Sequence, residues 1–224
     1  MLIFTGPAAS GKTTYMRVLC RKLRIHGKKC IRLVSTPFGG PAFLLVVFLT
    51  KLLIFSHRPR VIWPKWRGLR VLEKFNPKLL SKLLTLLVTL DFLFKTLQHL
   101  VLEALEKLGF TVLVEDYLPQ MISDHLFFKL YSNSKSKMLE HIIVLEVRFF
   151  YRYAMKSGNT TCIHVYADSL TRIRREARRS GAPYISNFYD KVARSIAPRN
   201  VCKALGIKTV FITNEEKVLV SSEC

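Results

Sequence analysis

The amino-acid sequence predicts an α/β fold in which a parallel five-stranded sheet is flanked by helices. Five short apolar segments alternate with longer segments whose apolar residues recur at helical spacing. Strands that alternate with helices pair in parallel, because each crossover returns the chain to the same end of the sheet. Half of the 224 residues are hydrophobic, so the chain can bury a core despite a formal net charge of +21. With no internal repeat or domain boundary, we expect a single domain over residues 1–224.

The predicted elements follow one another with glycine or proline at many of their ends. Apolar runs predict strands at residues 2–5, 30–35, 110–115, 161–167 and 208–213. The run at 110–115 is apolar and β-branched, which indicates a central parallel strand. Helical spacing predicts helices at residues 13–25, from about 42, and at about 77–109, 119–131, 138–156, 169–179 and 184–205, the last with a break at Pro198.

The segment that joins the first strand to the first helix is rich in glycine and small residues. It reads Gly6, Pro7, Ala8, Ala9, Ser10, Gly11, Lys12, Thr13 and Thr14. This spacing, between an apolar strand and an amphipathic helix, is that of a phosphate-binding P-loop. Backbone N–H groups would hold phosphate oxygens, Lys12 would reach the β- and γ-phosphates, and the Thr13 hydroxyl would bind Mg²⁺. The segment therefore predicts a P-loop NTPase fold with ATP and Mg²⁺ at residues 6–14.

Three features, spread over nearly the whole chain, occur in the order found in one family of small kinases. The first is the strand, P-loop and paired threonines, and the second is the strand that ends in Glu115, Asp116 and Tyr117. The third is the strand that leads to Asp168 and an arginine-rich helix. Together they resemble thymidylate kinase and its archaeal relatives. The resemblance implies a P-loop kinase domain that transfers phosphate from ATP to a nucleotide or nucleoside acceptor.

Glu115 and Asp116 lie where this family has Asp-Arg, at the carboxyl end of a strand. On the resemblance, Glu115 stands in for the carboxylate near Mg²⁺ or the attacking phosphate. Asp116 then replaces an arginine that would hold the acceptor's phosphate, which leaves the acceptor open. In a register shifted by one residue, Asp116 is instead the catalytic carboxylate. Both alternatives stay open, and the P-loop also lacks the acidic residue that many thymidylate kinases carry there.

The arginine-rich helix resembles the lid of these kinases, which would extend over about residues 169–183. Arg172, Arg175 and Arg179 share one face of this helix. Arginine side chains neutralise charge on a transferring phosphoryl group, and a closing lid excludes water. We therefore expect these three arginines to be catalytic, together with Lys12 and the carboxylate at the strand end.

The segment at about 42–78 lies where the family forms part of its acceptor site. After an apolar helix, it contains a basic stretch with Arg58, Arg60, Lys65, Arg67 and Arg70. One of these arginines is a candidate to hold an acceptor phosphate, and Phe38 is a candidate to stack on an acceptor base. Glu146 falls on an otherwise apolar helical stripe, so we expect its carboxylate to be paired or near a site.

The sequence leaves open two other functions, a small-molecule kinase with a non-nucleotide acceptor and a non-catalytic ATP-binding protein that acts at a membrane or nucleic acid. The basic composition favours polyanions, but no DNA- or RNA-binding motif occurs. Residues 79–105 have one polar face that includes His99, and the apolar segment at 42–55 is short, so neither is predicted to span a membrane. Peripheral membrane contact and a homodimer stay open. Five scattered cysteines predict reduced thiols, without a metal site or disulfide framework, in a cytoplasmic protein.

Overall fold

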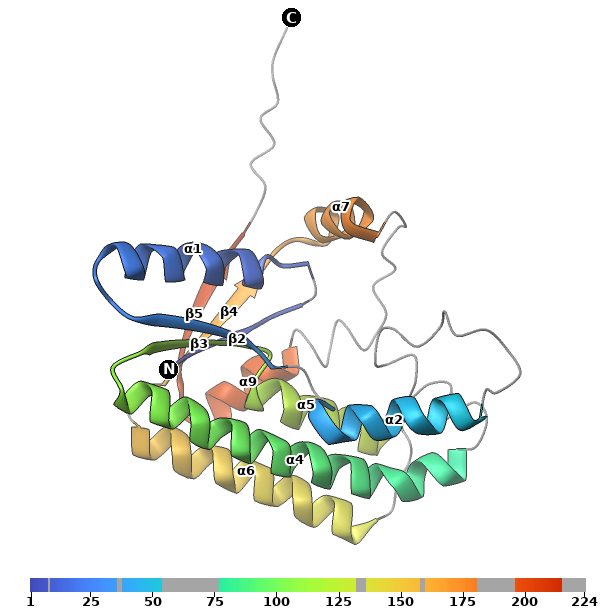
Figure 1. The fold of residues 1–224 in the computed structure, drawn as a ribbon. Coiled ribbons are helices and arrows are strands. Elements are labelled where there is room, and N and C mark those ends of the chain that lie inside the picture. Colours follow the sequence, from blue (N-terminus) through green and yellow to red (C-terminus); the bar gives the residue numbers. More distant parts are fainter. Residues whose placement is uncertain are drawn as a thin grey trace, which may run out of the picture.

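The protein is built around a five-stranded sheet whose strands all run parallel (Figure 1). A computed structural model describes residues 1–7, 9–35, 38–53, 77–131, 136–157, 160–180 and 196–214. The strands are β1 (Leu2–Thr5), β2 (Cys30–Val34), β3 (Thr111–Glu115), β4 (Thr161–Tyr166) and β5 (Lys208–Thr213). They lie in the order β2-β3-β1-β4-β5, so the predicted parallel five-stranded α/β arrangement is confirmed.

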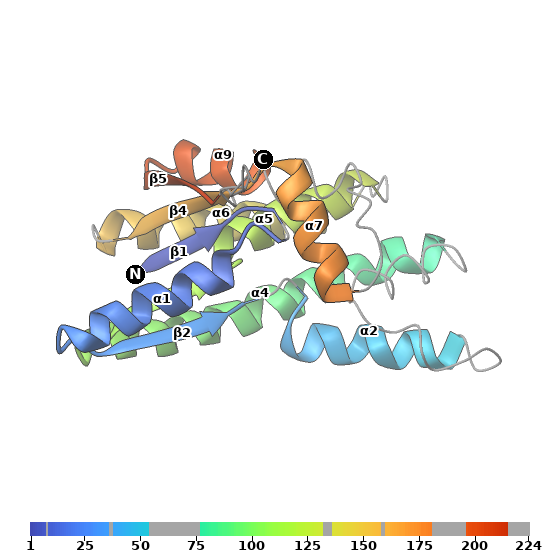
Figure 2. The ribbon, with the colours of Figure 1, turned by 90° about the horizontal axis from the view of Figure 1, so that it is seen from above.

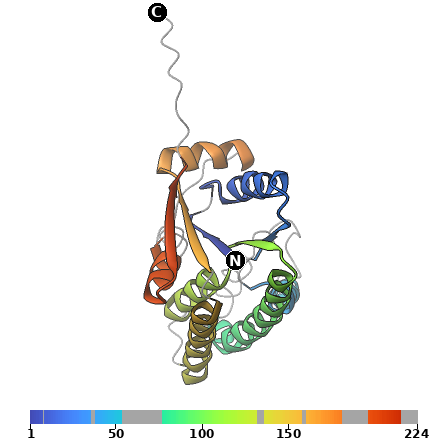
Figure 3. The ribbon, with the colours of Figure 1, turned by 90° about the vertical axis from the view of Figure 1, so that its left-hand side faces the viewer.

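Helices cover both faces of this sheet (Figure 3). On one face lies α1 (Lys12–Ile25), and on the other lie α4 (Pro77–Lys107), α5 (Leu118–Tyr131), α6 (Lys137–Ser157) and α9 (Ala197–Ala204). Figure 2 shows α7 (Ser169–Ser180) across the edge where the strands end, and α2 (Gly40–Leu53) packs against α4. Pro198 lies in the first turn of α9, where proline is well tolerated, and residues 184–195 of the longer predicted helix lie outside the described residues.

The internal strands supply the core, because helices cover them on both sides. Val112, Leu113 and Val114 of β3 are completely buried. Val112 and Val114 pack in the cluster beneath α4, α5 and α6, whereas Leu113 packs with Phe4 and Met16 beneath α1. β3 therefore faces two cores, as its apolar sequence predicted for an internal strand.

α4 buries polar side chains and exposes leucines, so the predicted polar face is wrong in part. Asp91, Lys95 and His99 are buried, whereas Leu93 and Leu97 are exposed. The buried polar groups pair with side chains of other elements, which the spacing of apolar residues cannot show. Within the described residues, Lys82–Lys107 is the one segment long and apolar enough to cross a membrane by length and composition. In this fold it packs against α6, α5 and β3, and 33% of its most apolar window is buried.

Cys20 of α1 and Cys30 of β2 form a disulfide, which corrects the prediction of reduced thiols throughout. α1 packs against β2 and brings the two Cα atoms to 5.6 Å, within the range that a disulfide requires. A separation of ten residues in sequence gives no sign of this contact, because it depends on how the chain turns after α1. The helix and the strand are thus joined covalently, while Cys162 and Cys202 are buried thiols.

Candidate functional site

The glycine-rich loop, residues 6–11, begins at the carboxyl end of β1, in the middle of the sheet. β1 pairs with β3 on one side and with β4 on the other. The chain leaves β1 toward β2 at one edge of the sheet and leaves β4 toward β5 at the opposite edge. Open α/β sheets bind ligands at such a switch point, outside the carboxyl ends of the strands. The loop therefore lies where this topology favours a ligand site; Ala8 is outside the described residues.

Two glycines of this loop have conformations and surroundings that disfavour any side chain. Gly6 has a φ of +136°, and a Cβ atom there would lie 2.2 Å from the carbonyl oxygen of Val165 in β4. Gly11 has a φ of +93°, and its Cβ would lie 2.0 Å from Nδ2 of Asn214. Between them, Ala9 also has a positive φ, of 59°. The loop is thus packed tightly against the ends of β4 and β5 before it enters α1.

Lys12 begins α1, and its ammonium group lies against the backbone of the loop. Nζ donates hydrogen bonds to the carbonyl oxygens of Gly6 at 2.9 Å and Pro7 at 3.1 Å. The same atom lies 3.7 Å from Oε1 of Glu115 and 3.6 Å from Oδ1 of Asp116. A buried ammonium requires such nearby negative charge. Lys12 is therefore held between its own loop and two carboxylates of a neighbouring strand end.

Glu115 and Asp116 both face the loop from the end of β3. The Thr13 hydroxyl donates a hydrogen bond to Oε2 of Glu115 at 2.6 Å. Asp116 has a left-handed backbone with a φ of +52°, and its N–H donates to the carbonyl oxygen of Phe4. Strained backbone of this kind is concentrated at functional sites. The structure thus brings both alternative carboxylates to Lys12, and it brings Glu115 to Thr13 as well.

Thr13 and Glu115 are the residues that could hold a magnesium ion. Hydroxyl and carboxylate oxygens are the hard donors that Mg²⁺ prefers, and here they are in direct contact. Mg²⁺ commonly binds through one or two protein oxygens and completes its shell with water and substrate phosphates. Among the residues with described positions, no group of three or more His, Cys, Asp or Glu side chains could hold a metal. The Thr13–Glu115 pair therefore fits a metal ion whose remaining ligands come from water and a phosphate.

The arginine-rich helix α7 lies across the carboxyl edge of the sheet, beside the loop (Figure 2). Nη1 of Arg175 lies 3.4 Å from the carbonyl oxygens of Ala9 and Ser10 and donates to both. Arg172, one turn earlier on the same face, is buried. Of the three arginines predicted to be catalytic, Arg175 thus contacts the loop and Arg172 lies in the interior. The side chain of Arg179 is outside the described residues.

Asn214 also contacts the loop, and the sequence analysis did not predict it. It follows β5, and its Nδ2 donates to the carbonyl oxygen of Ser10 at 2.9 Å. Nη2 of Arg175 in turn donates to the carbonyl oxygen of Asn214 at 3.3 Å. The signal that could have found this residue is its place just after a parallel strand, where ligand sites form.

His164 of β4 lies close to the loop as a neutral imidazole. Its Nδ1 lies 3.1 Å from the Thr5 hydroxyl. Burial, together with the positive charges of Arg199 and Lys12, lowers the pKa of His164 to about 4. At pH 7 this side chain therefore adds no positive charge to the site.

Phe38, the candidate for stacking on an acceptor base, is instead part of the core. Its side chain is 2% exposed, and its ring meets His125 and Phe128 edge-on, with centroids 5.0 and 5.6 Å away. A base could reach the ring only if the core beneath α4 opened, so this prediction is wrong. The basic stretch from Arg58 to Arg70 lies outside the described residues.

Asp91, His125 and Glu146 form a second charged cluster, buried between α4, α5 and α6. Nδ1 of His125 lies 2.9 Å from Oε1 of Glu146, and Nε2 lies 3.2 Å from Oδ2 of Asp91. Burial alone would lower the pKa of His125, but contact with the two carboxylates raises it to about 10. His125 is therefore protonated at pH 7. The pairing of Glu146 confirms the expectation that a carboxylate on this apolar stripe has a partner.

Asp91 also fixes the chain that follows β2. Its two carboxylate oxygens accept hydrogen bonds from the backbone N–H groups of Phe38 at 2.7 Å and Gly39 at 2.9 Å. The cluster thus joins three helices and this segment through groups that lie within hydrogen-bond distance of one another.

Comparison with models of protein families gave no match, and comparison with curated proteins gave none. Among solved structures, the chain is similar to one described as "Crystal structure of APE1195", with 16% sequence identity and a TM-score of 0.26. The similarity covers 92% of this chain and 91% of that chain.

Proposed function

We propose that the protein transfers the γ-phosphoryl group of Mg²⁺-ATP to a nucleoside or nucleotide, as its resemblance to thymidylate kinase implies. One contact carries the proposal: Thr13, at the start of α1, donates to Glu115, at the end of β3, with Lys12 beside the same carboxylate. Two sequence features that lie about a hundred residues apart thus meet at one point. The start of a helix, with its unpaired N–H groups, is in addition a favourable place for a phosphate.

Phosphoryl transfer requires positioning and charge neutralisation more than covalent chemistry by the protein. An acceptor oxygen bonds to the γ-phosphorus, the bond from that phosphorus to the β–γ bridging oxygen breaks, and ADP leaves. Lys12 would neutralise charge on the β- and γ-phosphates, while Thr13 and Glu115 would hold Mg²⁺. Asp116 would then orient the acceptor hydroxyl, whose proton passes to an oxygen of the transferred phosphoryl group as the new bond forms.

The proposal includes a P-loop NTPase fold in which α7 is the lid. Arg175 contacts the loop carbonyls of Ala9 and Ser10, so its guanidinium lies near any phosphate that the loop binds. A guanidinium pairs well with phosphate oxygens, because its planar fork matches their geometry. By the helical spacing of the sequence, Arg172 and Arg179 would share this face and add to the positive charge over the transferring group.

Asp116 favours an acceptor without a phosphate of its own. It occupies the place at which the resembled family has an arginine for the acceptor's phosphate, and its carboxylate would repel that group. Its Oδ1 lies 3.6 Å from Nζ of Lys12, so the negative charge is close to the reacting centre. We therefore expect nucleosides to react faster than nucleoside monophosphates.

Phosphate transfer from radiolabelled ATP to a panel of nucleosides and monophosphates, with Mg²⁺, tests the proposal. The key variant is Lys12→Ala, and its matched control is Lys107→Ala, an exposed lysine at the far end of α4. We expect Lys12→Ala to lower kcat by about 10³-fold and the control to leave it unchanged. ATP binding without transfer to any acceptor would overturn the proposal in favour of a non-catalytic protein. Transfer to non-nucleotide small molecules alone would favour the other kinase alternative.

A further inference from the structure

A second basic site lies on the outer side of α1, away from the glycine-rich loop. An open cavity of about 390 Å³ is lined by residues of α1 and of the edge strand β2, and we call it the arginine groove. Its lining residues are Arg17, Cys20, Arg21, Arg24, Ile25 and Arg32. None of these residues belongs to the candidate site around the glycine-rich loop, and Arg17 and Arg24 follow Lys12 by five and twelve residues, roughly 8 and 18 Å along a helix axis. The groove is therefore distinct from the proposed nucleotide site.

The groove concentrates four arginines that have no carboxylate partner among the described residues. The first 72 residues of the chain contain no Asp or Glu. In the part of the chain that the structure describes, none of the four groove arginines forms an ion pair with a carboxylate. Arg17 and Arg21 are four residues apart on α1, and Arg24 is three further on, so these like charges are neighbours that repel. A bound anion would relieve this repulsion.

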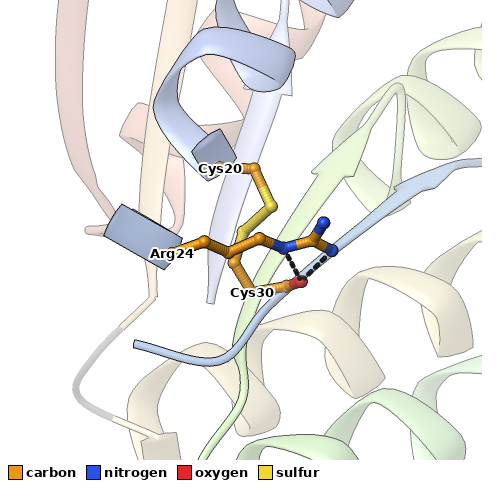
Figure 4. Close-up of a disulfide and its surroundings, with 3 residues drawn as sticks. All are labelled: Cys20, Arg24 and Cys30. Carbon is orange, nitrogen blue, oxygen red and sulfur yellow. Dashed lines mark hydrogen bonds between the residues drawn. A yellow bond between two sulfur atoms is a disulfide. The ribbon is translucent and has the colours of Figure 1, made fainter. Parts of the chain in front are cut away.

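The two walls of the groove are fastened to each other (Figure 4). Cys20 of α1 is joined by the disulfide to Cys30 of β2. Arg24 reaches from the helix to the strand, and its Nη2 and Nε donate to the carbonyl oxygen of Cys30 at 2.8 and 3.3 Å. These bonds involve two of the five N–H donors of a guanidinium. The arginines are thus presented from a rigid frame, which lowers the ordering cost of binding.

The shape and chemistry of the groove favour an extended chain of phosphates. Guanidinium groups pair with phosphate oxygens through two parallel hydrogen bonds. From Arg17 to Arg24 the row extends roughly 10 Å along the helix, and the groove is open to solvent. None of the described residues that line it is aromatic, so it offers no surface on which bases stack. A membrane attracts arginines through its anionic headgroups, but a broad headgroup layer fits a concave site less well than a single chain of phosphates does.

We propose that the arginine groove binds the phosphodiester backbone of a nucleic acid, independently of base sequence. This binding does not depend on the proposed kinase activity. Each arginine that neutralises a phosphate releases counterions, so affinity falls steeply as the salt concentration rises.

Fluorescence anisotropy of a labelled 20-nucleotide single strand of mixed sequence, titrated with the full chain at several salt concentrations, tests this inference. The test variant is Arg17→Ala/Arg21→Ala, which leaves Arg24 and its bonds to Cys30 in place. The matched control is Arg148→Ala/Arg152→Ala, which removes two exposed arginines at the same spacing from α6. We expect the groove variant to bind about tenfold more weakly or worse, with a salt slope lower by about 1.4, and the control to change affinity less than about twofold.

Three outcomes would overturn the inference. Equal losses in the groove variant and the control would show attraction to the basic surface as a whole. Capture on vesicles that contain phosphatidylserine, lost in the groove variant and without oligonucleotide binding, would assign the groove to a membrane. Displacement of the oligonucleotide by Mg²⁺-ATP in the wild type but not in Lys12→Ala would place it at the glycine-rich loop instead.

Discussion

Two places in the molecule hold a cation between two carboxylates, and they differ in how tightly they do so. At the loop, Nζ of Lys12 lies 3.7 Å from Glu115 and 3.6 Å from Asp116. In the interior, the imidazole of His125 lies at hydrogen-bond distance from both Asp91 and Glu146. The side chains of Glu115 and Asp116 are 11% and 18% exposed, whereas those of Asp91, His125 and Glu146 are completely buried.

The difference in distance and exposure means that Lys12 can exchange its ion-pair partners for others, whereas His125 cannot. Around Lys12 the ion pairs are longer than hydrogen bonds and lie at the carboxyl ends of the strands. A phosphate that enters the site could therefore replace the carboxylates as the partner of the Lys12 ammonium. Around His125 each charged group is satisfied and out of contact with water, so every change leaves an unpaired buried charge. We therefore expect substitutions at the loop to change activity, and substitutions in the interior to change stability.

The largest effect is expected for His125→Gln. A neutral amide would leave Asp91 and Glu146 buried without a cation, and breaking a buried ion pair costs about 3–5 kcal/mol. Urea denaturation at pH 7 measures this loss, with His141→Gln, an exposed histidine of α6, as the control. A loss below about 1 kcal/mol would show that the cluster contributes little to the fold. If the variant does not fold, Glu146→Gln, which keeps an amide oxygen as an acceptor for Nδ1 of His125, gives a milder version of the same test.

A smaller effect, on activity rather than stability, is expected at the strand end. Glu115→Gln should lower kcat by about 10²-fold, because the amide is a weaker ligand for Mg²⁺ and no longer balances Lys12. Asp116→Asn should lower it by about fivefold or less, since a partly exposed ion pair contributes at most about 1 kcal/mol and asparagine tolerates a left-handed backbone. Steady-state kinetics with a fixed acceptor measures both. The reverse order would assign the catalytic carboxylate to Asp116.

The most gradual effect, small at each step of pH, is expected in the pH dependence of stability, where two histidines act in opposite directions. The pKa of His125 is raised to about 10, so its contribution is complete below about pH 6.5 and is lost as the pH rises toward 10. The pKa of His164 is lowered to about 4, so its burial costs stability as the pH falls from about 6.5 toward 4. Each slope should be about 1 kcal/mol per pH unit in urea denaturation. His125→Gln should flatten the alkaline slope and His164→Gln the acid slope; an unchanged profile in either variant contradicts the corresponding assignment.

The elements that local sequence determines were predicted well, and those that depend on long-range contacts were not. An apolar run such as 110–115 predicts a strand by itself. The glycines at positions 6 and 11 likewise predict a tight turn after the strand at residues 2–5. The His125 cluster joins residues on three helices, so only Glu146 gave a sign of it, as a carboxylate among apolar neighbours. Phe38 lies between Pro37 and Gly39, which predict a loop. Its burial depends on the hydrogen bond from its backbone N–H to Asp91 on a distant helix, which the local sequence does not show.

The candidate site was predictable in its parts but not in their arrangement. The sequence showed that Glu115 and Asp116 follow a strand, and either could have faced the loop. That both do so depends on the pairing of β1 with β3 and on the left-handed turn at Asp116, which aspartate adopts more readily than most residues. Asn214 reaches the loop because β5 ends beside β4, a neighbour relation that no local pattern encodes.

The central place of β1 in the sheet has a consequence for the order in which the chain folds. Leu2 pairs with Leu113 on one side and with Thr161 on the other, so both partners of β1 come far later in the sequence. At about 5–20 residues per second, the ribosome needs roughly 8 to 30 seconds between making β1 and making β4. β1 can pair with β3 about 50 residues earlier than with β4, but the glycine-rich loop can pack against the end of β4 only after that strand has been made.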